Sequence, residues 1–192
     1  LICILLISFL NIKAQSNNTT FGLQYKPIIP SKYFNSSHVD ESYGEYSFNL
    51  MPKYSNAFGM ILRQKINQTF SIESGLNYIQ RNYKLTIMNS QQDVNDFTFF
   101  GIRSYEIPIQ LLTYVRISEF WYLNVTFGIS HNVLASNIIS YGEIDTFSQE
   151  TKRKEGGYTA LLANIGMEYR TENKGHYYIG ASLHNSFREI GR

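Results

Sequence analysis

The sequence predicts an all-β protein: an antiparallel up-and-down transmembrane β-barrel, with seven strands visible out of an expected eight. Apolar and polar residues alternate with period two along most of the chain, which is typical of strands with two unlike faces. The chain has 15 Tyr and 13 Phe among 192 residues, and only 17% of its residues are charged, against about 25% in an average soluble domain. The connections between the predicted strands alternate between short and long, as in bacterial outer-membrane barrels.

Residues 1–15 are predicted to be part of a signal peptide. Leu1 to Leu10 is apolar apart from one serine, but this run is too short to span a bilayer, which takes about 20 residues. Ala14, with Ile12 two places before it, fits a signal-peptidase site. No basic segment precedes Leu1, so the sequence is expected to begin inside the signal peptide. The alternative is a buried strand or helix of the mature domain.

The mature domain is expected to comprise residues 16–192. The single cysteine, Cys3, lies in the predicted signal peptide. An exported domain without disulfides needs another source of stability, and a closed hydrogen-bonded barrel supplies it. No later segment approaches 18 uninterrupted apolar residues, which excludes a transmembrane helix on sequence grounds.

The first three strands are predicted at residues 19–27, 54–66 and 69–87. In each, large apolar side chains alternate with small, polar or charged ones. The apolar rows are Phe21, Leu23 and Tyr25, then Phe58, Met60 and Leu62, then Phe70, Ile72, Leu76 and Tyr78. Further along the third strand, Tyr83, Leu85 and Ile87 continue in the opposite phase. This slip predicts either a β-bulge near residues 79–82 or a solvated upper strand.

The remaining strands are predicted at residues 104–117, 121–133, 161–170 and 177–184. The first of these has the clearest alternation, with an apolar row that runs from Tyr105 to Ile117. Twelve residues at about 3.3 Å each, tilted by about 40°, cover roughly 30 Å of height. That height is enough to cross the apolar band of an outer membrane.

Short connections are predicted at residues 67–68, 118–119 and 171–175, and long ones at 29–53, 90–96 and 140–156. Short turns lie on the periplasmic side of bacterial barrels and long loops on the outer side. The mature N-terminus is therefore expected in the periplasm, and the seventh strand ends outside. Because such barrels have an even number of strands, an eighth strand is expected beyond Arg192, so that the domain is incomplete at its C-terminus.

The soluble alternative is a β-sandwich or a lipocalin-like barrel, whose strands also alternate. Several of the predicted strands exceed the 3 to 10 residues, roughly, of ordinary strands. Aromatic residues gather near strand ends, at residues 97–100, 120–122 and 177–178, where membrane interfaces favour them. Both observations favour the membrane barrel.

Residues 105–115, YEIPIQLLTYV, resemble a segment that recurs in outer-membrane β-barrels of the Bacteroidetes, the PorT-like or outer membrane protein beta-barrel domain family. A strand of that family typically carries Glu-Ile-Pro, here Glu106, Ile107 and Pro108, followed by Leu-Leu and an aromatic residue. The signal-peptide ending Lys13-Ala14-Gln15 is similar to one common in that group. The resemblance implies an outer-membrane barrel. Its namesake takes part in a protein secretion system, a role that is not transferred to this chain.

If the apolar rows face lipid, the barrel lumen receives charges of both signs. These residues are Lys26, Arg63, Lys65, Glu73, Glu106, Arg116, Glu168 and Arg170. An eight-stranded barrel is just wide enough for side chains to fill, so the main prediction is a salt-bridged polar core without an open channel. The alternatives are a narrow ion path, or an acid/base pair formed by Glu73 and Glu106.

No catalytic constellation, cofactor site or metal site is predicted. His184 and Ser186 share a strand face and resemble the His-x-Ser pair of some lipid A deacylases, which leaves a membrane-embedded hydrolase as an alternative. Asp93, Asn95 and Asp96 in one loop offer a weak calcium site, but a solvated loop is the main expectation there.

The expected function is a structural or surface-binding role through the extracellular loops, in the bacterial outer membrane. Expected partners are outer-membrane lipid and lipopolysaccharide, and a protein or glycan at loops rich in Ser, Asn and Tyr. The net charge of +2 shows no nucleic-acid footprint, and a monomer is expected. A component of a secretion or transport machine, and a passive pore, are further alternatives.

Overall fold

The computed structural model describes residues 18–30, 39–89, 91, 94–135, 137–144, 147–152, 157–172 and 175–187, so the predicted signal peptide lies outside the described residues. Every regular secondary-structure element in this part of the chain is a β-strand. They are β1 Thr19–Ile28, β2 Val39–Tyr43, β3 Tyr46–Pro52, β4 Ser55–Lys65, β5 Phe70–Asn89, β6 Val94–Arg116, β7 Trp121–Leu134, β8 Ile138–Tyr141, β9 Ser148–Thr151, β10 Tyr158–Arg170 and β11 His176–Ser186.

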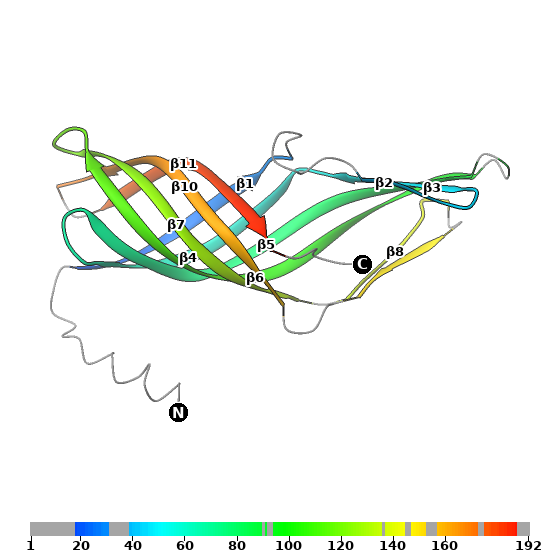
Figure 1. Ribbon diagram of the computed structural model, residues 1–192, viewed down its shortest axis with the longest axis horizontal. Helices are drawn as coiled ribbons and strands as arrows, with labels where there is room; N and C mark the ends of the chain where they lie inside the picture. The colour runs from blue at the N-terminus through cyan, green and yellow to red at the C-terminus, as the bar shows by residue number, and fades with distance from the viewer. Residues whose placement is uncertain are drawn as a thin grey trace, which may run out of the picture.

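The main sheet follows the chain as a meander, in the order β1-β4-β5-β6-β7-β10-β11, with every neighbouring pair antiparallel. These are the seven strands that the alternation predicts, so the predicted all-β antiparallel meander is confirmed. The sheet curls into a half-barrel (Figure 1). Its two edges are β1 and β11, which run in the same direction because the order reverses six times between them.

The two faces of this curled sheet are inverted relative to a soluble barrel. The inner face buries polar side chains: Glu168, Asn132 and Ser104 are fully buried, and Asn124 is nearly so. The outer face exposes large apolar ones, such as Phe127 at 60% and Ile109 at 58%. Soluble proteins rarely show contiguous apolar surface on this scale. The sandwich or lipocalin-like arrangement, with its apolar residues inside, is therefore not the one observed.

The three short connections lie together at one end of the half-barrel, at the left of Figure 1. In the β4–β5 turn, the side-chain oxygen of Asn67 accepts hydrogen bonds from the backbone N–H groups of Thr69 and Phe70, both at 2.8 Å. In the β10–β11 turn, the N–H of Thr171 donates to the carbonyl of Gly175 at 2.9 Å. The predicted short turns are confirmed.

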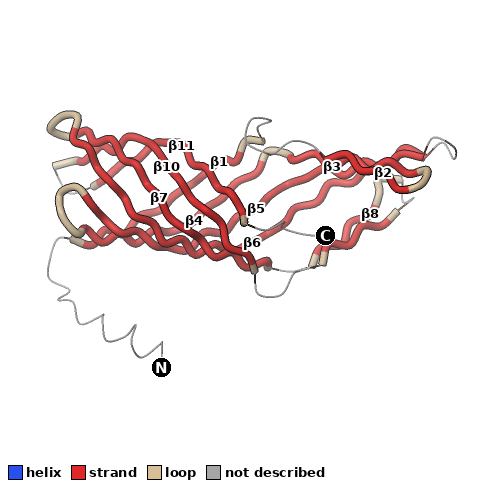
Figure 2. The backbone as a smooth tube through the Cα atoms, viewed as in Figure 1, coloured by secondary structure: helices blue, strands red, loops and turns tan. Residues whose placement is uncertain are grey.

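The long connections differ from the prediction, because they contain β-hairpins rather than loops. The connection at residues 29–53 carries the hairpin β2–β3, and that at 140–156 carries most of the hairpin β8–β9. The β5–β6 hairpin also continues far beyond the half-barrel. Together, β2, β3, β8, β9 and the distal parts of β5 and β6 (residues 83–89 and 94–100) form an elongated extension, called the arm below (Figures 1 and 2).

The arm grows from the half-barrel by an exchange of strand partners. The part of β5 up to Gln80 pairs with β4, and the part from Tyr83 onward pairs with β3. The N–H of Lys53, between β3 and β4, donates to the carbonyl of Asn82 at 2.7 Å at the point of exchange. The β8–β9 turn docks on β6, where the N–H of Glu143 donates to the carbonyl of Phe97 at 3.0 Å.

The bulge considered near residues 79–82 is absent from β5. The β5–β6 register is constant from Phe70↔Thr113 to Asn89↔Val94. The apolar row instead changes face within a regular strand: Tyr78 lies on the outer face, whereas Ile79 lies inside and is 3% exposed. Ile102 on β6 lies at a similar level and packs against the buried cluster of Leu134, Tyr158 and Ala160. An apolar layer thus covers the polar interior toward the arm.

Glycine at position 128 is required by close packing of β7 against β6. A methyl group there would overlap the carbonyl oxygen of Ile109, whereas one on Gly22 in β1 would meet only the flexible side chain of Ile61. We expect Gly128→Ala to destabilise the protein by about 1–3 kcal/mol, and Gly22→Ala to change it much less. Urea unfolding of the two refolded variants measures both effects, and equal midpoints would contradict the assignment.

Candidate functional site

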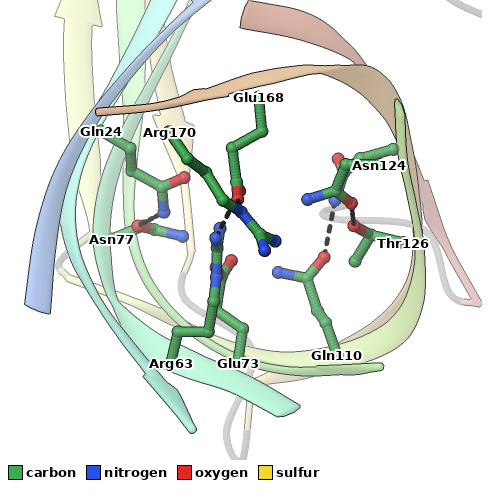
Figure 3. Close-up of polar contacts among 10 residues, drawn as sticks. Gln24, Arg63, Glu73, Asn77, Gln110, Asn124, Thr126, Glu168 and Arg170 are labelled. Carbon is green, nitrogen blue, oxygen red and sulfur yellow. Dashed lines mark hydrogen bonds and ion pairs between the residues drawn. The ribbon is translucent and has the colours of Figure 1, made fainter. Parts of the chain in front are cut away.

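The part of the interior nearest the short turns is organised around the guanidinium of Arg63 on β4 (Figure 3). Its Nε and Nη2 donate to Oε2 of Glu73 on the neighbouring strand, at 2.9 and 2.8 Å. Its Nη1 donates to Oε2 of Glu168 on β10 at 2.5 Å. β4 is the second strand in the sheet order and β10 the sixth, so this ion pair crosses the interior.

Arg170 extends this cluster toward the short turns. Its Nε donates to the second carboxylate oxygen of Glu168 at 2.8 Å. Its guanidinium carbon lies 3.8 Å from the ring centroid of Tyr122 and 4.5 Å from that of Tyr114. Cation–π contacts of this kind favour a fixed guanidinium orientation. Both oxygens of the fully buried Glu168 are therefore engaged by arginine, as a buried carboxylate requires.

A layer of amide pairs lies next to the charged cluster, on the side toward the arm. Gln24 on β1 donates to Asn77 on β5 at 2.6 Å, and Asn164 on β10 donates to Gln110 on β6 at 2.7 Å. Each of these bonds passes over an intervening strand on the inner face. Thr126 also donates to Asn124 on its own strand at 2.8 Å (Figure 3). Buried polar groups must be paired in this way to avoid a desolvation penalty.

A second charged set lies nearer the apolar layer. Glu106 on β6 accepts a hydrogen bond from Asn77 at 3.4 Å, and its Oε2 lies 3.9 Å from Nε2 of His184 on β11. Nδ1 of His184 lies 3.4 Å from Nη2 of Arg81 on β5, and Arg81 also donates to the hydroxyl of Tyr158 at 3.0 Å. This set links four strands of the half-barrel.

The structure brings together four of the eight predicted lumen residues, Arg63, Glu73, Glu168 and Arg170, in one network. Glu106 belongs to the separate upper set. Lys26 lies on the inner face of β1, and Lys65 near the short turns.

Arg116 lies at the β6–β7 turn, where its Nε donates to the carbonyl of Ser118 at 3.1 Å. Pro108, part of the family-like motif with Glu106 and Ile107, is fully buried on the inner face. Ile107 faces outward and is half exposed.

One interior charge, Arg81, was not among the predicted lumen charges, whereas the alternation already indicates that His184 lies on the inner face. Arg81 has the same phase as Ser71 and Glu73, so a constant register through β5 would have placed it inside. The apparent phase slip of the apolar row concealed it. Its role follows only from the unbroken pairing of β5 with β6.

The catalytic alternatives gain no geometric support. Glu73 is held by Arg63, whereas Glu106 contacts a separate set of residues, so the two carboxylates do not share an environment. His184 and Ser186 lie on the inner face, as the alternation indicates, and both ring nitrogens of His184 face interior residues. Within the described residues, no group of three or more His, Cys, Asp or Glu is placed to hold a metal ion.

Asp96 corrects the expectation of a solvated loop in this region. It is 1% exposed, and its Oδ1 accepts hydrogen bonds from the N–H groups of Phe97 and Ile144, at 2.8 and 3.2 Å. Its carboxylate therefore fastens the β8–β9 hairpin to β6. Asp93, the first residue of that weak calcium motif, lies outside the described residues.

No family model, curated protein or solved structure matches this chain. The described part of the chain also contains no helix with the length and apolar character needed to cross a bilayer.

The Arg63–Glu168–Arg170 network predicts a large stability effect for Glu168→Gln. Removing one partner of a buried ion pair costs about 3–5 kcal/mol, because the remaining charges stay buried without compensation. The matched control is Glu150→Gln in the arm, where Glu150 lies 3.9 Å from Lys152 and both side chains are exposed. Loss of such a surface pair costs about 0–1 kcal/mol.

Urea unfolding of the refolded variants provides the comparison. Similar midpoints for the Glu168→Gln and Glu150→Gln variants would show that the interior network does not hold the half-barrel together.

Proposed function

We propose that this chain is a small outer-membrane β-barrel protein with a structural or surface-binding role through its arm. The single observation that carries the proposal is the inverted distribution of side chains, with a paired polar interior and an apolar outer face. Polar interiors and lipid-facing apolar bands are characteristic of membrane barrels. Water would disfavour this outer surface, whereas hydrocarbon would solvate it.

The dimensions of the strands support insertion. β7 has 14 residues, which at about 3.3 Å each and a tilt of about 40° span roughly 35 Å along the barrel axis. Its outer face begins with Trp121, whose ring centroid lies 5.1 Å from that of Tyr169. Phe120 is 6.1 Å from the same tyrosine. Clustered aromatic rings at a strand end suit a membrane–water interface.

The proposed orientation has the short turns in the periplasm and the arm outside the cell. It rests on the usual asymmetry of bacterial barrels, and the signal-peptide-like residues 1–15 are consistent with export. The resemblance of residues 105–115 to PorT-like barrels agrees with a Bacteroidetes source. The cross-interior ion pair favours a filled lumen over a conducting one.

The arm supplies the proposed binding surface. Tyr43 at the end of β2 is 83% exposed, and Ile139, Tyr141 and Ile144 in the β8–β9 hairpin are each at least 60% exposed. Exposed aromatic and aliphatic side chains on an ordered scaffold suit contact with a protein or a glycan. No observation in the interior favours the hydrolase alternative over this role.

Insertion is tested by charge substitution on the outer face. Ile129→Arg in the middle of β7 is expected to make the free energy of folding into vesicles less favourable by about 2–4 kcal/mol, which is the cost of a basic side chain near the bilayer midplane. Ile139→Arg in the arm, at an isoleucine that is 60% exposed against 49% for Ile129, should have little effect because that position faces water. Heat-modifiable gel mobility measures the folded fraction, and equal sensitivity of the two positions would overturn the membrane assignment.

Orientation is tested by labelling introduced cysteines, since the sole native cysteine lies in the predicted signal peptide. On intact cells, a membrane-impermeant maleimide should label Lys152→Cys in the arm. It should label Glu119→Cys in the β6–β7 turn only after the outer membrane is permeabilised. The reverse pattern would place the short turns outside.

A further inference from the structure

A cavity of about 510 Å³ opens at the short-turn end of the interior. Its walls come from β1, β4, β5, β6 and the β10–β11 region, and it reaches from the turn residues Asn67 and Thr171 to Tyr114 and Arg63. This volume lies within the range of about 300–1,000 Å³ that small-molecule sites occupy. The charged cluster around Arg63 forms the inner end of the cavity.

The cavity wall is cationic. Arg63, Lys65 and Arg170 line it, together with the imidazole of His176, and no Asp or Glu is among its described lining residues. The nearby carboxylates Glu73 and Glu168 lie behind the wall and are engaged by Arg63 and Arg170.

The cationic groups differ in how far they are neutralised. Arg63 uses all three of its guanidinium nitrogens on the two carboxylates. Arg170 makes its ion pair through Nε only, and no carboxylate pairs with Lys65 among the described residues. The ammonium of Lys65 and the outer edge of Arg170 therefore remain available to a ligand.

Further donors accompany these charges. Tyr114 is 6% exposed. Its hydroxyl lies near Ser71, but the two groups do not meet the distance and angle of an ordinary hydrogen bond. A buried hydroxyl left in this state favours an additional hydrogen-bond partner. The side-chain oxygen of Asn67 is occupied by two backbone N–H groups, so the group that Asn67 can offer the cavity is its amide N–H₂.

We propose that this cavity binds a small solute through a carboxylate or phosphate group, which enters from the side of the short turns. Lys65 and the free edge of Arg170 carry the charge recognition, because charge-assisted hydrogen bonds to oxyanions are the strongest available to these side chains. The hydroxyl of Tyr114 and the amide of Asn67 add uncharged donors. This site lies at the opposite end of the molecule from the arm.

The test is calorimetric titration of the full chain, folded in detergent, with inorganic phosphate and with succinate in separate experiments, and with glycerol as an uncharged probe. We expect saturable binding of at least one anion and none of glycerol. Binding of phosphate alone or succinate alone identifies the recognised group. Absence of saturable binding of both anions at low ionic strength overturns the proposal.

Substitutions at two lysines test whether the anion binds in this cavity. Lys65→Gln should weaken binding about tenfold, the loss expected for one charge-assisted hydrogen bond, and Lys65→Arg should retain most of the affinity. Lys26→Gln is the matched control, since it removes the same charge from the inner face of β1 outside the cavity lining.

Equal weakening by Lys65→Gln and Lys26→Gln would show only a general attraction of anions to a basic lumen and would overturn the assigned site. Heat-modifiable mobility of each variant separates a loss of binding from a loss of folding. An anion site can fail this test while insertion and the role of the arm remain intact.

Discussion

The ion pair between Arg63 and Glu168 is the interaction on which the rest of the architecture depends. Its partners lie 105 positions apart in the chain, on strands separated by three others in the sheet order. A flat sheet would hold these strands far apart, so the 2.5 Å contact requires the curl. Burying Glu168 is tolerable only because Arg63 and Arg170 engage both of its oxygens.

The inward polar network in turn determines the outer surface. Period-two alternation sends every second side chain outward, and most of those side chains are apolar beside the charged interior. Between Tyr78 and Ile79 this relation reverses, although the hydrogen bonding of β5 to β6 does not change. The same pair of strands thus serves two environments. Below this level the apolar side chains face outward, and above it they form the buried layer around Tyr158 and Ile102.

Much of this arrangement could be predicted from the sequence, because alternation directly encodes which side chains share a face. The seven strands of the meander, the three tight turns and the inward orientation of Arg63, Glu73 and Glu168 all follow from it. The hairpins β2–β3 and β8–β9 could not be predicted in the same way. β2 is exposed on both faces, so no contrast between its two rows marks it as a strand.

Which charged side chains pair within the interior could also not be predicted from the sequence. Alternation placed eight charges inside without showing that Arg63 would join Glu168 rather than Glu106, because partners across the interior depend on register and curl. Arg81 was overlooked for a related reason. Tyr83, Leu85 and Ile87 share its inward face, and their apolar character suggested that the strand had slipped.

The unbroken course of β5 and β6 from half-barrel to arm has a mechanical consequence. Neither strand contains a loop where the apolar row changes face, so the arm has no hinge there. A load applied to the tip along these strands would act on many interstrand hydrogen bonds in parallel, as shear, instead of opening them one after another. Bending of the arm relative to the half-barrel at this level would therefore require distortion of paired strands.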